Sequence, residues 1–289
     1  MMIQTLLVAF SLAVGTDAFV APRQVVRPQY SYQQHVLFMG WGPEPIWTAA
    51  TVIGNDVACT SGACVSVSVD VGDTDLTKEY TIPGQYVQLR LNEETKPLFL
   101  AIASPPNAES SVLEFLVKKT DTNEWLTDAS IGAAVQISQV LGGGFPIEEN
   151  LNSLKYDFPT QNVMLFAVGS GIAPIRAAIE SGYLKTGAAN NGGRSARVYY
   201  GERSPGDLCF TDHFAKWEAA GVEVVPVLSQ PPSSWGGRSG YVQNALEEDG
   251  VPIPRNSGAL LCGMKGMAES VKDVLVKAGV FEGRVLTNF

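Results

Sequence analysis

The chain has 289 residues, of which 45% are hydrophobic and 17% charged, and its formal net charge is −9. This composition is typical of a globular protein and excludes a wholly disordered, collagen-like or coiled-coil chain. The length predicts two domains, and the negative charge argues against a nucleic-acid binder, which needs a basic surface facing phosphates. Two histidines and four cysteines are too few and too scattered along the sequence to indicate a zinc ribbon or a His-rich metal site. Any redox chemistry is therefore expected to need an organic cofactor.

The N-terminal segment has the pattern of a targeting sequence. An apolar run at residues 3–15 has the length of a signal peptide, and residues 19–39 contain arginine but no acidic residue, as transit peptides do. The stretch around Phe19 resembles the cleavage motif of bipartite plastid-targeting presequences in algae with secondary plastids. We predict a signal peptide at 1–18, a transit-like segment at 19–39 and import into the plastid stroma, with secretion as the alternative. The rest of the chain has no second long apolar run, so no membrane span is expected there.

The remaining sequence changes its pattern once. Up to residue 158, short alternating apolar runs are separated by glycine and proline, which predicts an antiparallel β-barrel or sandwich. From residue 159 the pattern predicts strands at 163–168, 197–200, 222–228 and 260–262, alternating with helices at 174–181, 214–220 and 264–278. This alternation is typical of a parallel α/β sheet. We expect a barrel domain at 40–158 and an α/β domain at 159–289.

A glycine-rich turn follows the first strand of the predicted α/β domain. Such a turn brings backbone N–H groups and a helix N-terminus against a phosphate, although a tight turn without a ligand needs the same residues. Its place at the end of the first parallel strand favours the phosphate site. The turn consists of Gly169, Ser170, Gly171, Ile172, Ala173 and Pro174.

Motifs in the same order along the chain resemble the ferredoxin–NADP reductase superfamily, in which a flavin-binding barrel precedes a nicotinamide-nucleotide domain. The stretch at 99–106 (FLAIASPP) is similar to that of small plant and algal members without an iron–sulfur cluster. The other motifs are PGQYV at 83–87, GGGF at 142–145, the turn at 169–174, YGER at 200–203, LSQ at 228–230 and CGM at 262–264. The resemblance implies FAD, or FMN, in the barrel and NADP or NAD in the second domain.

The flavin side departs from the family pattern. Leu98, Leu100 and Ala101 stand where the family has the Arg, Tyr and Ser that contact the flavin, so those three side-chain functions are lost. The resemblance leaves the backbone of Phe99, Ala101, Ile102, Ala103 and Ser104, and the Ser104 hydroxyl, to face the ring. Three further assignments are open. Asn123 is a phosphate anchor or only a helix cap; Gly142, Gly143 and Gly144 lie beside the flavin or form a plain turn; and Phe289 covers the ring or packs in the core.

The nicotinamide side follows the family more closely. Cys262 is expected beside the reacting ring carbon, or is a small apolar filler, and Arg203 suits a 2′-phosphate but also occurs in relatives that use NADH. The other residues implied to bind the nucleotide are Tyr200, Gly201, Ser229, Gln230, Gly263, Met264 and Met267.

The resemblance implies a flavin-dependent NAD(P)H oxidoreductase that passes a hydride between nicotinamide C4 and flavin N5. Its electron acceptor is unknown, with a small electron-carrier protein as one candidate. The alternative is a non-catalytic nucleotide-binding or scaffold member that has lost flavin. Cys59 and Cys64 are interpreted as structural, because Val67 stands where a plant-type iron–sulfur pattern needs its third cysteine.

Overall fold

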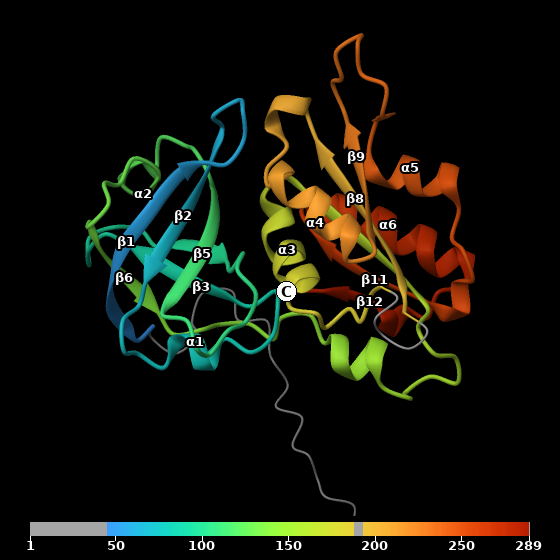
Figure 1. The fold of residues 1–289 in the computed structure, drawn as a ribbon, viewed down its shortest axis with the longest axis horizontal. Coiled ribbons are helices and arrows are strands. Elements are labelled where there is room, and N and C mark those ends of the chain that lie inside the picture. Colours follow the sequence, from blue (N-terminus) through green and yellow to red (C-terminus); the bar gives the residue numbers. More distant parts are fainter. Residues whose placement is uncertain (1–44, 188–192, 289) are drawn as a thin grey trace, which may run out of the picture. The chain divides into compact units, whose positions relative to one another are not determined.

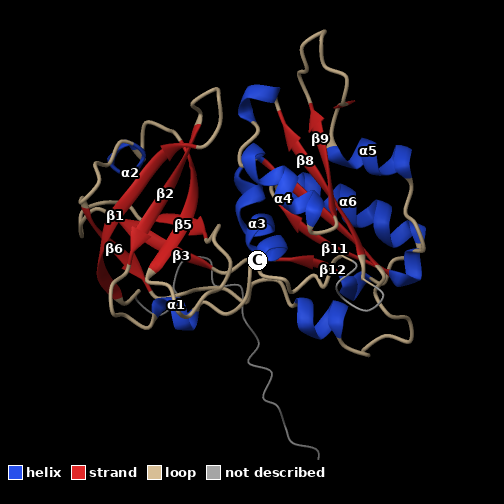
Figure 2. Cartoon of the chain, viewed as in Figure 1, coloured by secondary structure: helices blue, strands red, loops and turns tan. Residues whose placement is uncertain are grey.

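The computed structural model describes residues 45–187 and 193–288, which contain two six-stranded sheets (Figures 1 and 2). The predicted targeting segments and Phe289 lie outside the described residues and stay predictions. Among the described helices, none has both the length and the apolar character needed to cross a bilayer.

The first sheet is antiparallel and nearly closes on itself, as predicted for the barrel. Its strands follow the order β4-β3-β6-β1-β2-β5, and a bridge between Ile102 and Phe115 joins the segment after β4 to β5. In β2, Val65, Val67 and Val69 are buried in the barrel core, because alternate residues of a strand face the same side. The elements are β1 (Trp47–Val57), β2 (Cys64–Asp70), α1 (Leu76–Glu79), β3 (Tyr86–Arg90), β4 (Leu98–Ala101), β5 (Val112–Lys118), α2 (Glu124–Thr127) and β6 (Ala134–Ser138).

The second sheet is parallel, as predicted, with the strand order β10-β9-β8-β7-β11-β12. Helices cover both of its faces (Figure 2). The elements are β7 (Asn162–Val168), α3 (Ile172–Glu180), β8 (Ser195–Glu202), α4 (Phe214–Ala219), β9 (Val222–Leu228), β10 (Arg238–Ser239), α5 (Val242–Asp249), β11 (Ser257–Cys262), α6 (Lys265–Ala278) and β12 (Val285–Thr287).

Strand β7 shows how the sheet separates two cores. Val163, Leu165 and Ala167 point into the core that contains α3 and α4, whereas Met164 and Phe166 point into the core that contains α5 and α6. Both faces are therefore buried, which is why β7 reads as a continuous apolar run rather than an alternating one. The elements α5, β10 and β12 were not predicted. Strands β10 and β12 are too short to show a period, whereas α5 does bury Val242, Ala245 and Leu246 at helical spacing.

The connection between the sheets runs from residue 139 to residue 161 and includes one π-helical turn, Glu148–Asn152. The predicted boundary between residues 158 and 159 falls in this connection. One core cluster contains Leu116 and Ala103 of the barrel together with Ile172 and Leu165 of the α/β domain. The two sheets are therefore packed against each other within one compact unit, residues 45–289.

Candidate functional site

The turn from β7 into α3 forms the centre of the site. Gly169 has a φ of +59°, which side chains rarely permit, and Gly169–Gly171 form a 3₁₀ turn directly before α3. A Cβ on Gly171 would lie 2.3 Å from the carbonyl oxygen of Cys262, so only glycine fits there. The turn and the start of α3 line a cavity, and the first N–H groups of a helix have no carbonyl partner within that helix.

This turn lies where the order of the parallel strands reverses. From β7 the chain continues to β8 on one side, whereas from β11, the neighbour of β7 on the other side, it continues outward to β12. Ala167 pairs with Cys262 at the C-terminal ends of the two strands. Ligands of such sheets bind outside the strand ends at this reversal, so the fold itself marks the position.

A cavity of about 980 Å³ opens at these strand ends. Most residues predicted on the nicotinamide side lie together in its wall. They are Gly169, Ser170, Gly171, Ala173, Pro174, Gly201, Arg203, Ser229, Cys262, Gly263, Met264 and Met267.

Three residues predicted on this side lie outside the wall. Ile172 is buried in the core beneath the turn, and Gln230 is exposed beyond the cavity. Tyr200 is also buried, and its hydroxyl donates to Glu202 Oε1 at 3.1 Å and accepts the N–H of Cys209 at 3.1 Å. These positions support the site rather than face it.

Besides the predicted Arg203, the cavity wall contains charged residues that were not assigned from the sequence. Among the described residues these are Lys118, Glu202 and Asp207. Burial raises the pKa of Glu202, whereas hydrogen bonds from Ser204 lower that of Asp207. Glu202 stands next to Arg203 in the YGER stretch, so the sequence motif could have pointed to it. No sequence motif pointed to Lys118, because only the fold brings the end of β5 to the cavity.

The Cys262 side chain is held in its neutral form. Burial raises the pKa of this thiol to about 12, so it is protonated near neutral pH. A protonated thiol is a weak nucleophile. Cys262 lies at the end of β11 and faces the cavity. This position is better suited to a small side chain that packs against a ring than to a nucleophile.

The barrel supplies an apolar wall to the same cavity. Phe99, Leu100, Ala101 and Leu116 line it, and Phe99 is 66% exposed. Leu98 and Leu100 also pack against the barrel core, at positions where the resemblance implies polar side chains. The Phe99 ring lies 6.1 Å from that of Tyr86, tilted by 44°. The wall therefore offers an aromatic surface in place of the family's side-chain hydrogen bonds.

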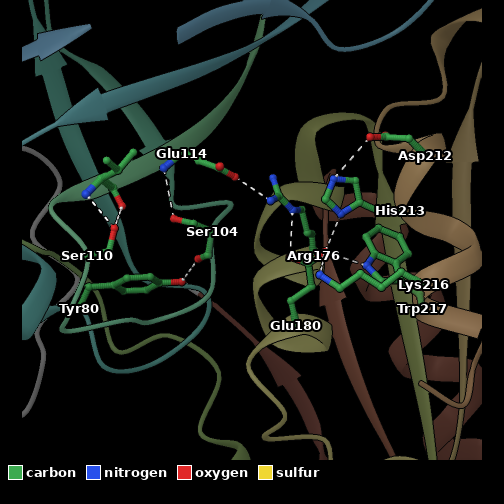
Figure 3. Close-up of polar contacts among 11 residues, drawn as sticks. Tyr80, Ser104, Ser110, Glu114, Arg176, Glu180, Asp212, His213, Lys216 and Trp217 are labelled. Carbon is green, nitrogen blue, oxygen red and sulfur yellow. Dashed lines mark hydrogen bonds and ion pairs between the residues drawn. The ribbon is translucent and has the colours of Figure 1, made fainter. Parts of the chain in front are cut away.

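The segment after β4 does not offer the groups that the sequence analysis assigned to it. The N–H of Ile102 donates to Gln85, and that of Ala103 donates to Glu114, both through backbone carbonyls. Ser104 Oγ accepts the N–H of Glu114 at 3.1 Å, and the Ser104 carbonyl accepts the Tyr80 hydroxyl at 2.9 Å (Figure 3). These residues lie outside the cavity wall, because the barrel's own closure uses their backbone groups.

Asn123 has its side chain occupied within its own loop. Its Oδ1 accepts the N–H of Thr120 at 2.9 Å and its Nδ2 donates to the Lys118 carbonyl at 2.8 Å. The side chain makes no cap hydrogen bond to α2, a helix of only four residues. Asn123 is the N-cap residue of α2, and its carbonyl accepts the N–H groups of Leu126 and Thr127, while its side chain braces the loop after β5.

The glycines at 142–144 are explained by packing. Gly142 and Gly144 have positive φ angles, and a Cβ on them would lie 2.7 Å from Tyr86 Cε1 and from Ile82 Cγ2, respectively. Gly143 has open space around its Cα. None of the three lines the cavity. The structure therefore favours the turn over a direct cofactor contact.

A chain of ion pairs fixes α3 behind the turn (Figure 3). Arg176 of α3 contacts Glu114 of β5 at 2.6 Å and Glu180 at 3.4 Å. Glu180 also accepts from His213 Nδ1 at 2.7 Å and from Trp217 Nε1 at 2.9 Å. Although burial opposes it, these donors and the Arg176 charge lower the pKa of Glu180. The helix that positions the glycine turn is thus anchored both to the barrel and to α4.

Three of the four cysteines lie together beside the cavity. The sulfur atoms of Cys59, Cys64 and Cys209 are within 4.8 Å of one another, and all three thiols are free and buried. Cys64 itself lines the cavity. The cysteines are scattered along the sequence, but three of them are not scattered in space.

Comparisons with known proteins agree with this arrangement. Residues 165–273 match the family model described as an oxidoreductase NAD-binding domain. The fruit protein pKIWI502 of Actinidia deliciosa is 35% identical over 252 residues, which are 83% of this chain and 76% of that protein. The NADH-cytochrome b5 reductase 1 of Emericella nidulans is 23% identical over 212 residues, 70% of this chain and 65% of that protein.

Solved structures show the same fold. A ferredoxin NADP+ reductase from Neisseria gonorrhoeae with bound FAD and NADP superposes with a TM-score of 0.65 at 14% identity, covering 83% of this chain and 97% of that one. The cytochrome b5 reductase domain of Ulva prolifera nitrate reductase gives a TM-score of 0.65 at 16% identity, covering 84% and 97%. The similarity spans the barrel and the parallel sheet together.

The neutral state of Cys262 has a measurable consequence. Because its pKa is raised to about 12, the rate of alkylation of Cys262 by iodoacetamide should rise about tenfold per pH unit from pH 7 to 10. A free cysteine under the same conditions should level off above its ordinary pKa of about 8.5. Peptide mapping by mass spectrometry isolates Cys262 from the other thiols. A rate that is already level at pH 8 would contradict the neutral thiol.

Proposed function

The chain belongs to the ferredoxin–NADP reductase superfamily, and on that premise we propose that it is a flavin-dependent NAD(P)H oxidoreductase. One observation carries the proposal. A single cavity is lined on one side by the phosphate-loop turn and the end of β11, and on the other by strand β4 of the barrel. Two cofactors that must exchange a hydride have to meet in such a shared space.

The α/β side fits a nicotinamide nucleotide. The Gly169–Gly171 turn carries only the small Ser170 side chain at the cavity wall, which leaves its backbone open to a pyrophosphate. Arg203 and Lys118 supply two positive charges near the carboxylates of Glu202 and Asp207. Because the charges of the wall are balanced, amides and a helix end must supply most of the attraction for an anion.

The barrel side fits the ring of a flavin better than its phosphate. The exposed face of Phe99 and the small side chain of Ala101 leave room for a flat aromatic group. Among the described barrel residues, Lys118 is the cation in the cavity wall. We assign the flavin phosphate to Lys118, because the Asn123 side chain is already hydrogen-bonded within its own loop.

A flavin and a nicotinamide nucleotide held by these two walls would supply hydride transfer between nicotinamide C4 and flavin N5. The protein's own part is to position and to exclude water. Cys262 and Gly263 form the part of the cavity wall against which we place the nicotinamide. Leu100 and Leu116 make the opposite wall apolar. The step needs no general base, which agrees with a neutral Cys262. The electrons then leave to an acceptor, for which we propose a small electron-carrier protein.

A second function rests on the same substitutions. Leu98 and Leu100 pack against the barrel core, so the family's polar flavin contacts are absent. A chain that binds the nucleotide but not the flavin would act as a nucleotide-binding or scaffold protein. The flavin experiment below separates the two functions.

The enzyme function predicts a yellow protein. The purified full chain should bind one FAD or FMN, and NAD(P)H added without oxygen should bleach the flavin absorbance. Phe99→Ala should weaken flavin binding by about tenfold because it removes the exposed aromatic surface. Ile131→Ala, an exposed residue outside the cavity, is the control. A colourless chain that takes up neither flavin would sink the enzyme proposal and favour the scaffold function.

The phosphate-loop assignment predicts the effect of one added side chain. Gly171→Val should weaken NADPH binding at least about tenfold, because its Cβ would displace the Cys262 backbone. Gly236→Val is the matched control, since no atom lies within 4 Å of a Cβ added there. Calorimetric titration measures both variants. Equal affinities would mean that the pyrophosphate binds elsewhere.

The choice of coenzyme depends on Arg203. This exposed side chain at the end of β8 is the cation placed to contact a 2′-phosphate. Arg203→Ala should lower the affinity for NADPH about tenfold and leave that for NADH nearly unchanged. Arg255→Ala, outside the cavity wall, serves as the control. Equal losses for both coenzymes would show that Arg203 does not distinguish them.

A further inference from the structure

The three clustered thiols come from both domains. Cys59 follows β1 and Cys64 begins β2, and the turn between them is closed by hydrogen bonds from Ala58 N–H to the Cys64 carbonyl and from Gly62 N–H to the Cys59 carbonyl. Cys209 lies in the loop after β8 of the α/β domain. This loop meets the turn directly, because Ser61 N–H donates to the Gly206 carbonyl at 2.8 Å. The cluster therefore lies on the contact between the two domains.

The spacing of the sulfurs suits one small ion. A thiolate-bound zinc ion lies about 2.3 Å from each sulfur, so sulfurs that share an ion are at most about 4.6 Å apart. All three sulfurs lie within 4.8 Å of one another, and the residues are only 5%, 8% and 0% exposed. Small side-chain rotations would place all three at bonding distance.

The surroundings favour a soft cation. Thiolates are the ligands that Zn²⁺ and Cu⁺ prefer, and three of them with a divalent ion leave a net charge of only −1. All three donor atoms of the group are sulfur, and Lys118 lines the same cavity wall as Cys64.

Neighbouring oxygen atoms orient the other two thiols. Cys59 Sγ lies 3.4 Å from Ser61 Oγ, and Cys209 Sγ donates to the Asp207 carbonyl at 3.5 Å. Outer contacts of this kind hold metal ligands in place. Within the described residues, no fourth His, Cys, Asp or Glu joins the group. An ion here would have three sulfur ligands, and Ser61 Oγ is the oxygen next to one of them.

We propose that Cys59, Cys64 and Cys209 form a tri-thiolate site for a thiophilic d10 cation, Zn²⁺ or Cu⁺, which fastens the barrel to the α/β domain beside the cavity. Binding replaces the three thiol protons and changes no oxidation state. The bound ion closes a link between residues 59–64 and residue 209. It therefore stabilises the contact that shapes one wall of the cavity, independently of whether flavin binds.

Metal titration of the reduced full chain tests the site. Co²⁺ serves as the probe for Zn²⁺, because its thiolate complexes absorb strongly in the near ultraviolet. One equivalent should bind, release protons into a weakly buffered solution, and be displaced by one equivalent of Zn²⁺. A separate titration with Cu⁺ against a coloured chelator decides between the two ions. Tight one-to-one binding of either ion supports the proposal.

Matched variants locate the ion. Cys209→Ser should weaken binding by more than about 100-fold, since loss of even an outer contact costs 10- to 100-fold. Cys262→Ser, the fourth cysteine and outside the cluster, should bind the metal as the wild type does. Circular dichroism checks that both variants fold. If Cys209→Ser does not fold, protection from N-ethylmaleimide in the wild type replaces it: bound metal should shield Cys59, Cys64 and Cys209 but leave Cys262 unchanged.

Three outcomes of these titrations would overturn the proposal. They are the absence of one-to-one binding by either ion, equal affinity in wild type and Cys209→Ser, and metal protection that does not fall on these three thiols. A disulfide between two of the three in the freshly isolated chain, with no bound metal, would likewise assign the cluster to thiol oxidation instead.

Discussion

The packing of the barrel against the parallel sheet is the constraint on which the site depends. Each domain supplies only one wall of the cavity, so neither forms the site without the other. The contact is held by a shared apolar core and, at its polar edge, by the Glu114–Arg176–Glu180 chain. Arg176 is buried and paired on both sides, and removal of one partner from such a group typically costs about 3–5 kcal/mol. The ion pairs thus fix the orientation of α3 more than they add to stability.

The same helix connects the fold to the proposed chemistry. Its N-terminus carries the glycine turn, its middle carries Arg176, and its last residue, Glu180, is bonded to His213 and Trp217. Any shift of the barrel along this contact would therefore move the turn as well. The thiol cluster lies in a second contact between the same two domains and involves different loops. Two separate fastenings restrict the domains more than either does alone.

The helices and strands with periodic apolar patterns were predictable from sequence, whereas the contacts between residues far apart in the chain were not. The strand β9 was predicted with its observed ends, and β7, β8, α3, α4 and α6 within two residues, because their apolar patterns are long. The glycine turn was recognised from its glycines and from its place after the first strand of the predicted α/β domain. Ser104 and Asn123 were assigned to the flavin, but their polar atoms are used by barrel backbone that a pattern cannot reveal. Lys118 and the meeting of Cys209 with Cys59 and Cys64 arise only when the two domains pack.

The contact between Gly171 and the end of β11 has a consequence for affinity. Because the turn is pressed against the Cys262 carbonyl, its backbone has little freedom left once the protein has folded. The conformational entropy of this loop is lost during folding and not again when a ligand arrives. A loop ordered in advance can hold a dianion through neutral amides in a chain whose net charge is −9. Rigidity here takes the place of positive charge.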